Sequence, residues 1–214
     1  MNIVFDFGAV LFGWQPDKLL ARHFPQLTQT PADARQLAQA VFHHDSWQRF
    51  DKGTVELAAV VSETATRLAL PAPALHALMA PIGEELEPIA CNVDLLGQLR
   101  HRREQAGDVR LYYLSNMPAP FARVLEQKHA FIDWFDGGIF SGDVKLGKPD
   151  PAIYELLASR HALAPEHTLF IDDMAVNVQA ARDLGWQAIH CQQPEALAAQ
   201  LQAALQGQDQ QARR

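Results

Sequence analysis

Reactive side chains follow three short apolar runs of this chain. The run at residues 3–5 ends in a single carboxylate, the run at 109–114 in a hydroxyl and an amide, and the run at 168–171 in two carboxylates. A lysine stands apart from them in the string Gly-Lys-Pro-Asp. These side chains are Asp6, Ser115, Asn116, Lys148, Asp172 and Asp173. Their types are those that phosphoryl transfer uses.

Each type of side chain has a defined task in that chemistry. A carboxylate such as Asp6 can attack phosphorus and carry the phosphoryl group covalently. The pair Asp172 and Asp173 can hold Mg²⁺, a hard cation that prefers oxygen ligands and screens the phosphate charge. The hydroxyl of Ser115 and the ammonium of Lys148 can bind the equatorial phosphoryl oxygens. Taken singly, each residue also has an ordinary explanation as a turn, a helix cap or a solvated loop side chain.

The apolar runs predict a sheet that gathers these side chains. We interpret four runs as strands and one as a weaker fifth: residues 3–5, 109–114, 168–171, 187–189 and, as the fifth, 138–140. Such runs suit strands that are buried on both faces of a parallel sheet. Helical patterns at 92–105, after Asp150-Pro151 and at 174–184 alternate with them. This alternation predicts an α/β, doubly wound, Rossmann-like domain with its chemistry at the carboxyl ends of the strands.

A smaller second domain is predicted after the first strand. Residues 15–80 carry helical patterns throughout and are punctuated by prolines. We therefore expect an α/β core at residues 1–14 and 82–205 and a small helical cap domain at 15–81. The polar, Gln-rich residues 206–214 are expected to form a flexible tail.

Composition narrows the range of partners and compartments. The chain has 214 residues, of which 48% are hydrophobic, and a net charge of −7. An acidic chain lacks the basic surface that nucleic-acid binding needs. No apolar run approaches the roughly 18 residues of a membrane span, and no signal peptide is evident. With only two cysteines, far apart, we expect a cytoplasmic protein without a membrane or nucleic-acid partner, whose oligomeric state the sequence leaves open.

The ordered set of motifs resembles the haloacid dehalogenase-like (HAD-like) hydrolase superfamily. That family opens with a nucleophilic Asp after the first strand, and this chain has Asp6-Phe7-Gly8-Ala9-Val10 there. The later motifs are a Ser or Thr, a Lys in a Gly-Lys-Pro-Asp-Pro string, and an acidic pair. They correspond here to Ser115, residues 147–151, Asp172 and Asp173, with Asn177 four residues further on. The resemblance covers residues 1–195.

The resemblance implies a fold and a role for each residue. It implies strand order 5-4-1-2-3 and a helical cap inserted between the first and second motifs. Asp6 is then the nucleophile, and Ser115, Asn116 and Lys148 bind the substrate's phosphoryl group. Mg²⁺ is expected on four groups: Asp6, the Gly8 carbonyl, Asp173 and, directly or through water, Asp172. The implied activity is that of a Mg²⁺-dependent phosphatase acting on a small phosphorylated metabolite, for which a sugar phosphate is one candidate.

Gly8 departs from the family pattern. Most phosphatases of the family carry a second Asp at this position, which acts as general acid and base. Glycine keeps the backbone carbonyl as a metal ligand but supplies no proton. The motif resembles a phosphatase branch that includes bacterial α-D-glucose-1-phosphate phosphatase.

Two other functions remain open at this point. The 2-haloacid dehalogenases also lack the second Asp, and there Asp6 would attack carbon without a metal. The acidic pair Asp172-Asp173 favours the phosphatase, because two carboxylates facing a third suit a cation. A catalytically weak binding or regulatory protein that has lost its acid at Gly8 is the further alternative.

The predicted cap contains polar and aromatic residues without an assigned role. His43 and His44 point to different sides of a helix, so we expect a surface cluster and not a zinc site, although either could replace the missing acid in part. Trp47, Arg49 and Asp51 either line the roof over the substrate or only pack and solvate the cap.

Overall fold

A five-stranded parallel sheet forms the centre of the protein. The computed structural model describes the backbone of residues 1–211 and the side chains of residues 1–206. The strands are β1 (Asn2–Phe5), β2 (Arg110–Ser115), β3 (Gly137–Phe140), β4 (Thr168–Asp172) and β5 (Gln187–His190). They lie in the order β3-β2-β1-β4-β5, with every neighbouring pair parallel. This is the predicted order 5-4-1-2-3 read from the other edge, so the fold prediction is confirmed.

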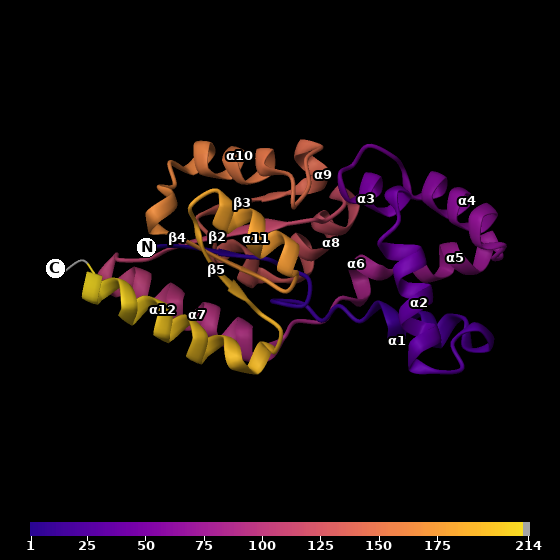
Figure 1. Cartoon of the computed structure of the whole chain (residues 1–214), viewed down its shortest axis with the longest axis horizontal. Coiled ribbons are helices and arrows are strands. Elements are labelled where there is room, and N and C mark those ends of the chain that lie inside the picture. The colour runs from indigo at the N-terminus through magenta and orange to yellow at the C-terminus, as the bar shows by residue number, and fades with distance from the viewer. Residues whose placement is uncertain (212–214) are drawn as a thin grey trace.

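Helices cover both faces of the sheet, which explains the uninterrupted apolar runs in the strands (Figure 1). On one face, Ile3 and Phe5 pack in the core that includes α7 (Ala90–Ala106), α8 (Ala119–Lys128) and α12 (Leu197–Gln211). On the other face, Val4 packs in the core formed with α10 (Pro151–His161) and α11 (Ala175–Asp183). Successive strand residues point to opposite faces, so each position of β1 from Ile3 to Phe5 is buried.

Local signals in the sequence explain where these helices begin and end. The Asp150 side chain accepts a hydrogen bond from the Ala152 amide and Pro151 occupies the first helical position, so α10 begins there. Gly107 takes the left-handed conformation that ends α7. Residues 206–211, predicted as part of a flexible tail, continue the helix α12; four of these six residues are Gln, which favours helix. Residues 212–214 of that tail lie outside the described part.

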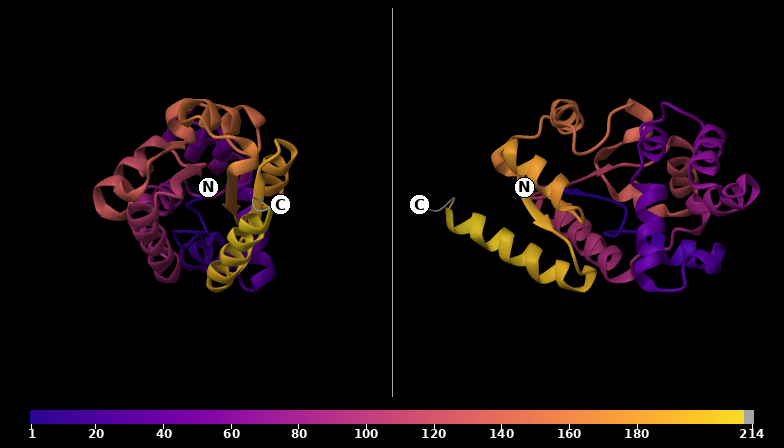
Figure 2. Two further views of the ribbon diagram at one scale, coloured as in Figure 1. Left: turned by 90° about the vertical axis from the view of Figure 1, so that its left-hand side faces the viewer. Right: turned by 45° about the vertical axis from the view of Figure 1, so that its right-hand side comes forward.

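The helices between the first two strands form a separate layer beside the carboxyl ends of the strands (Figures 1 and 2). They are α1 (Pro16–His23), α2 (Pro31–Phe42), α3 (Asp45–Asp51), α4 (Leu57–Leu68), α5 (Ala72–Met79) and α6 (Ile82–Glu85). Helices α1 to α5 fall within residues 15–81, the range predicted for the cap. Their buried side chains, such as Leu20 and Leu75, continue the core on the α7 face of the sheet. Cap and sheet therefore share one apolar interior.

Short elements complete the chain. They are the 3-10 turns η1 (Pro25–Leu27), η2 (Ala130–Trp134), η3 (Pro165–His167) and η4 (Pro194–Ala196), and the helix α9 (Ser141–Val144). Within residues 1–211, none of the helices combines the length and apolar character that crossing a bilayer requires.

The end of α3 is fixed to the core at three points. Phe50 packs edge-on against Phe121 of α8, with the ring centroids 5.5 Å apart. The Ser141 hydroxyl, at the start of α9, donates a hydrogen bond to the Asp51 carbonyl. Gly53, at φ +64°, approaches the backbone so closely that a Cβ there would lie 2.5 Å from the Gly142 carbonyl oxygen. This junction holds the cap in place over the sheet edge.

The Gly53 contact predicts a position-specific loss of stability. Gly107 has nearly the same φ, +67°, but an added Cβ meets no atom within 4 Å, so it is a matched control. We expect Gly107→Ala to cost about 1–2 kcal/mol through backbone strain alone. Gly53→Ala should cost more, because the junction must also open. Urea denaturation midpoints of the two variants measure the difference, and equal losses would contradict the close packing at Gly53.

Candidate active site

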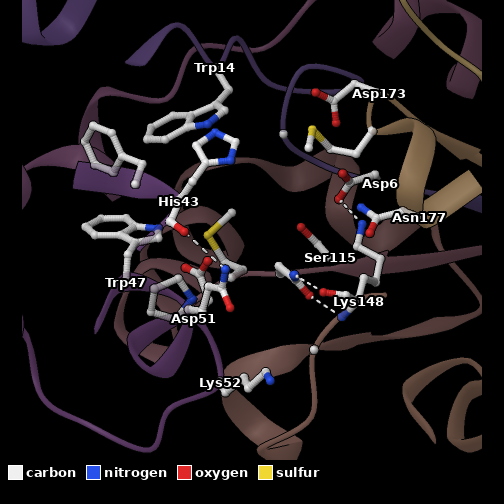
Figure 3. A pocket seen from close by; sticks show the side chains of 18 of the residues that line it. Asp6, Trp14, His43, Trp47, Asp51, Lys52, Ser115, Lys148, Asp173 and Asn177 are labelled. Atoms are coloured by element: carbon white, nitrogen blue, oxygen red, sulfur yellow. Dashed lines mark hydrogen bonds and ion pairs between the residues drawn. The ribbon is translucent and has the colours of Figure 1, made fainter. Parts of the chain in front are cut away.

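A cavity of about 570 Å³ lies between the cap and the carboxyl ends of the strands. Its floor holds most of the residues that the sequence singles out: Asp6, Gly8, Ser115, Asn116, Lys148 and Asp173. Figure 3 shows Asp6 and Asp173 on one side of it and cap residues Trp47 and Asp51 on the other. The strand ends thus bring together residues that are up to 167 positions apart, because the strands are parallel and adjacent.

Lys148 lies between two carboxylates at the bottom of this cavity. Its Nζ is 2.9 Å from Asp6 Oδ1 and 2.6 Å from Asp172 Oδ2, and the residue is only 5% exposed. Burial opposes the positive charge, but Asp172 and Asp6 outweigh it, so the pKa of the ammonium is raised. Lys148 is therefore charged at neutral pH and has a donor left for a substrate oxygen.

Asn116 fixes the backbone of that lysine. Its Nδ2 donates to the Lys148 carbonyl at 3.0 Å, and its Oδ1 accepts from the Lys148 amide at 2.8 Å. Both ends of the Asn116 amide are thus engaged with Lys148, although the residue also lines the cavity. This position, predicted as a substrate contact, orients the lysine.

Asp172 and Asp173 differ in their surroundings despite being adjacent. Asp172 is fully buried and accepts hydrogen bonds from the Met174 amide, the Asn177 side chain and Lys148. Asp173 is partly exposed to the cavity, and within residues 1–206 its carboxylate makes no ion pair and is engaged only by its own backbone amide. Asp173 is the freer ligand of the two, whereas Asp172 anchors Lys148.

The three carboxylates lie close enough to repel one another. Asp6, Asp172 and Asp173 each offer an oxygen within 4.8 Å of the others. Burial raises the pKa of Asp6 from 3.8 to about 7; Lys148 opposes this shift, and Asp172 and Asp173 add to it. Burial and the charge of Asp172 raise the pKa of Asp173 to about 6. Such a set gains most from a bound cation, which favours the ionised forms.

Ser115 and Gly8 present unengaged oxygens to the same space. Ser115 is 1% exposed, and its hydroxyl has no hydrogen-bond partner in the part of the chain with described side chains. The Gly8 carbonyl likewise receives no hydrogen bond within that part, although the neighbouring Phe7 carbonyl accepts several. A phosphoryl oxygen and a cation, respectively, suit these positions.

The cap residues that had no role assigned from the sequence fall into two groups in the structure. His43, Trp47 and Asp51 line the cavity. His44 instead caps α3, its Nδ1 accepting from the Ser46 amide. Arg49 pairs on the surface with Asp45 and Glu63.

Sequence reasoning gave no site role to two further positions. Trp14, just after β1, lines the cavity, and Asn177 in the first turn of α11 holds both oxygens of Asp172. The spacing of Asn177 behind the acidic pair was a usable signal. No comparable signal marks Trp14.

Comparison with known proteins agrees with this geometry. A family model described as haloacid dehalogenase-like hydrolase matches residues 93–185. A HAD family enzyme from Bacteroides thetaiotaomicron, in complex with magnesium and inorganic phosphate, superposes with a TM-score of 0.65 and 20% identity, over 88% of this chain and 92% of that one. Residues 93–185 therefore match the haloacid dehalogenase-like hydrolases in sequence, and the chain shares the fold of a HAD family enzyme.

Two further proteins similar to this chain carry different activities. The sesquiterpene phosphatase astK of Aspergillus oryzae is 27% identical over 87% of each chain. The L-2-haloacid dehalogenase of Xanthobacter autotrophicus, with chloropropionic acid covalently bound, has 20% identity and a TM-score of 0.61, over 87% of this chain and 75% of that one. Proteins similar to this chain thus carry either activity, so the choice between the two depends on the site.

The buried position of Lys148 predicts a pH-dependent loss of stability on its removal. Lys148→Met leaves the carboxylates of Asp6 and Asp172 without their cation, which typically costs about 3–5 kcal/mol. Without Lys148 the pKa of Asp6 rises above about 7, so Asp6 is neutral in the folded variant at pH 5.5 and less of the ion pair is lost there. The loss should therefore be larger at pH 8.5 than at pH 5.5, as measured by urea denaturation.

Lys52→Met is the matched control for this variant. Lys52 lines the same cavity but makes no ion pair within the described side chains. We expect it to change stability by no more than about 0.5 kcal/mol at either pH. A pH-independent loss in Lys148→Met would contradict the role given to its charge.

Proposed function

We propose that this protein is a Mg²⁺-dependent phosphatase that hydrolyses small organic phosphates through an aspartyl-phosphate on Asp6. The observation that carries the proposal is the cluster of Asp6, Asp172 and Asp173 around one point, with Lys148 beside it. A carboxylate that attacks a phosphate dianion needs positive charge nearby. The cluster of carboxylates can bind a cation that supplies this charge. The similarity to a sesquiterpene phosphatase supports the same reading.

The donor set fits Mg²⁺. Asp6 Oδ1 is engaged with the Phe7 amide and Lys148, which leaves Oδ2 for a ligand. Asp173 and the Gly8 carbonyl supply further unengaged oxygens, and hard oxygen ligands are those that Mg²⁺ prefers. Asp172, already saturated by its donors, supports the site through Lys148. When bound, the cation withdraws charge from the phosphoryl oxygens and keeps Asp6 ionised.

The residues of the chain then divide the work of the reaction. Asp6 attacks phosphorus in line with the departing ester oxygen, which places that oxygen on the cap side of the cavity. Ser115 Oγ and Lys148 Nζ donate to the equatorial oxygens, where charge accumulates. Asn116 and Asp172 hold the Lys148 ammonium in position. Water then attacks the phosphoryl group on Asp6 and releases inorganic phosphate.

The cap side of the cavity favours an apolar body on the substrate. Trp14, Phe42 and Trp47 form a chain of edge-on rings, with centroids 5.2 and 4.7 Å apart. Further apolar residues line the cavity, namely Ile82, Leu86, Met117, Phe121 and Val176. We therefore favour a prenyl, alkyl or aryl phosphate over the sugar phosphate that the sequence raised as a candidate. The similarity to the sesquiterpene phosphatase of Aspergillus oryzae supports an isoprenoid body.

A dehalogenase remains the second candidate, supported by the structural likeness to L-2-haloacid dehalogenase and by Gly8. In that reaction Asp6 would displace halide from carbon, and no metal would be needed. The acidic pair argues against it, because Asp173 has no task there. A weak binding protein would instead retain phosphate without turnover.

Asp6→Asn tests the nucleophile and the reaction class together. An amide forms no aspartyl-phosphate, so phosphate release from p-nitrophenyl phosphate with Mg²⁺ should fall by roughly 10⁴-fold or more. Wild-type activity should also vanish in excess chelator and return with Mg²⁺. The exposed Asp94→Asn on α7 is the matched control and should keep full activity. Halide release from 2-chloropropionate in chelator, without phosphatase activity, would favour the dehalogenase.

The rings of Trp14, Phe42 and Trp47 form an aromatic wall of the cavity, and this wall predicts the preferred organic group of the substrate. Each buried CH₂ contributes about 0.8 kcal/mol, so kcat/KM for a ten-carbon prenyl phosphate should exceed that for glucose 1-phosphate by more than tenfold. The measurement is phosphate release at limiting substrate. A preference for the sugar would contradict the role given to Trp14 and Trp47 while leaving the phosphatase proposal intact.

A further inference from the structure

We propose that Asp51, on the cap, donates the proton to the leaving-group oxygen and so replaces the general acid that Gly8 lacks. The inference rests on the proposed phosphatase function. It concerns a residue 43 positions after Gly8, where the family carries its acid.

Asp51 stands where a departing oxygen would be. It ends α3 and lines the cavity, and in Figure 3 it lies on the cap side, across from Asp6. In-line attack by Asp6 drives the ester oxygen away from Asp6, toward the cap. The Asp51 carboxyl makes no hydrogen bond or ion pair within residues 1–206, so it is free to meet a substrate atom.

The backbone around Asp51 is held firmly. The Ser141 hydroxyl binds its carbonyl, Phe50 packs on Phe121, and Gly53 abuts Gly142. These contacts tie the end of α3 to the same core that carries Ser115 and Lys148. An acid must be positioned against its reacting atom to be useful, and this junction supplies that position.

The surroundings favour the protonated form of Asp51. Burial raises its pKa well above the usual 3.8, the negative charge of Asp6 raises it further, and Lys148 opposes the shift. A neutral carboxyl between cap and core can donate a proton at a pH where an exposed one could not.

Other candidate acids at the cavity are less suited. Asp150 uses its carboxylate to cap α10, and His44 uses its ring to cap α3. Lys52 is a cation on a flexible stem in the loop after α3. His43 faces the cavity but is exposed, so it is the competitor that an experiment must separate from Asp51.

The step balances without any further reactant. As the Asp6 oxygen forms its bond to phosphorus, the bond from phosphorus to the ester oxygen breaks and its electron pair stays on that oxygen. The Asp51 proton passes to the oxygen, so an alcohol leaves and Asp51 becomes a carboxylate. In the second half, Asp51 takes a proton from the water that attacks the phosphoryl group on Asp6, which restores both carboxyls.

The test compares esters with good and poor leaving groups. We would measure kcat/KM with Mg²⁺ for p-nitrophenyl phosphate and for an alkyl phosphate of similar size. Nitrophenolate leaves without a proton, whereas an alkoxide does not. Asp51→Asn should lower the alkyl value by about 10²–10⁴-fold, the usual contribution of general acid catalysis, and the nitrophenyl value much less. The ratio of the two values does not depend on how much of the variant is folded.

Three further variants sharpen the result. Asp45→Asn, an exposed Asp on the same helix, should leave both values unchanged, and His43→Gln should leave their ratio unchanged. Gly8→Asp in the Asp51→Asn background should restore part of the alkyl activity. Position 8 has room for a side chain, since an added Cβ comes no closer than 3.9 Å to Trp14 Cβ.

The outcomes separate this inference from the proposed function. If the wild type hydrolyses both esters and Asp51→Asn lowers both values equally, or lowers neither, Asp51 is not the acid and the phosphatase stands. A changed ratio in His43→Gln instead of Asp51→Asn would assign the acid to His43. If the wild type hydrolyses neither ester, the phosphatase proposal fails and this inference fails with it.

Discussion

The buried ion pairs of Lys148 hold the site together. Three carboxylates would otherwise share the edge of the sheet with only water to separate their charges. The Lys148 ammonium, 2.9 Å from Asp6 and 2.6 Å from Asp172, offsets the repulsion between these carboxylates. The lysine is in turn fixed by Asn116 at its backbone, and Asp172 by Asn177. The carboxylates still outnumber the single ammonium, and the pKa values of Asp6 and Asp173 remain raised. A bound metal cation would neutralise this excess negative charge.

The two layers of the protein contribute different parts of the proposed reaction. The sheet edge supplies the nucleophile, the phosphate contacts and the metal ligands, because all of them follow parallel strands. The cap supplies the aromatic wall and Asp51, on the side from which a leaving group departs. Such a division means that the cap sets the substrate body and the proton supply while the core chemistry stays the same. The contacts at Ser141, Gly53 and Gly142 fix the position of the cap relative to the core.

Much of this was predictable, and the exceptions have a common cause. The five strands and the gathering of Asp6, Ser115 and Asp173 at one edge followed from the apolar runs and the residues behind them. The strand order and the role of Lys148 came from the resemblance to the HAD-like hydrolases. Residues 206–211 continue the backbone of α12, and their polar composition alone did not indicate a helix there. The cap residues were left open, since a helical pattern does not reveal which turn faces a neighbouring domain.

The sequence by itself determined the chemistry of the core: residues directly behind parallel strands must share an edge, whatever else the chain does. Only the tertiary structure decided which cap residues join them. His43 and His44 are adjacent, yet one lines the cavity and the other caps α3. Asp51 faces the core site because Ser141, ninety residues later, anchors its backbone. Contacts of that range depend on how two packed layers dock, and no local spacing in the chain encodes them.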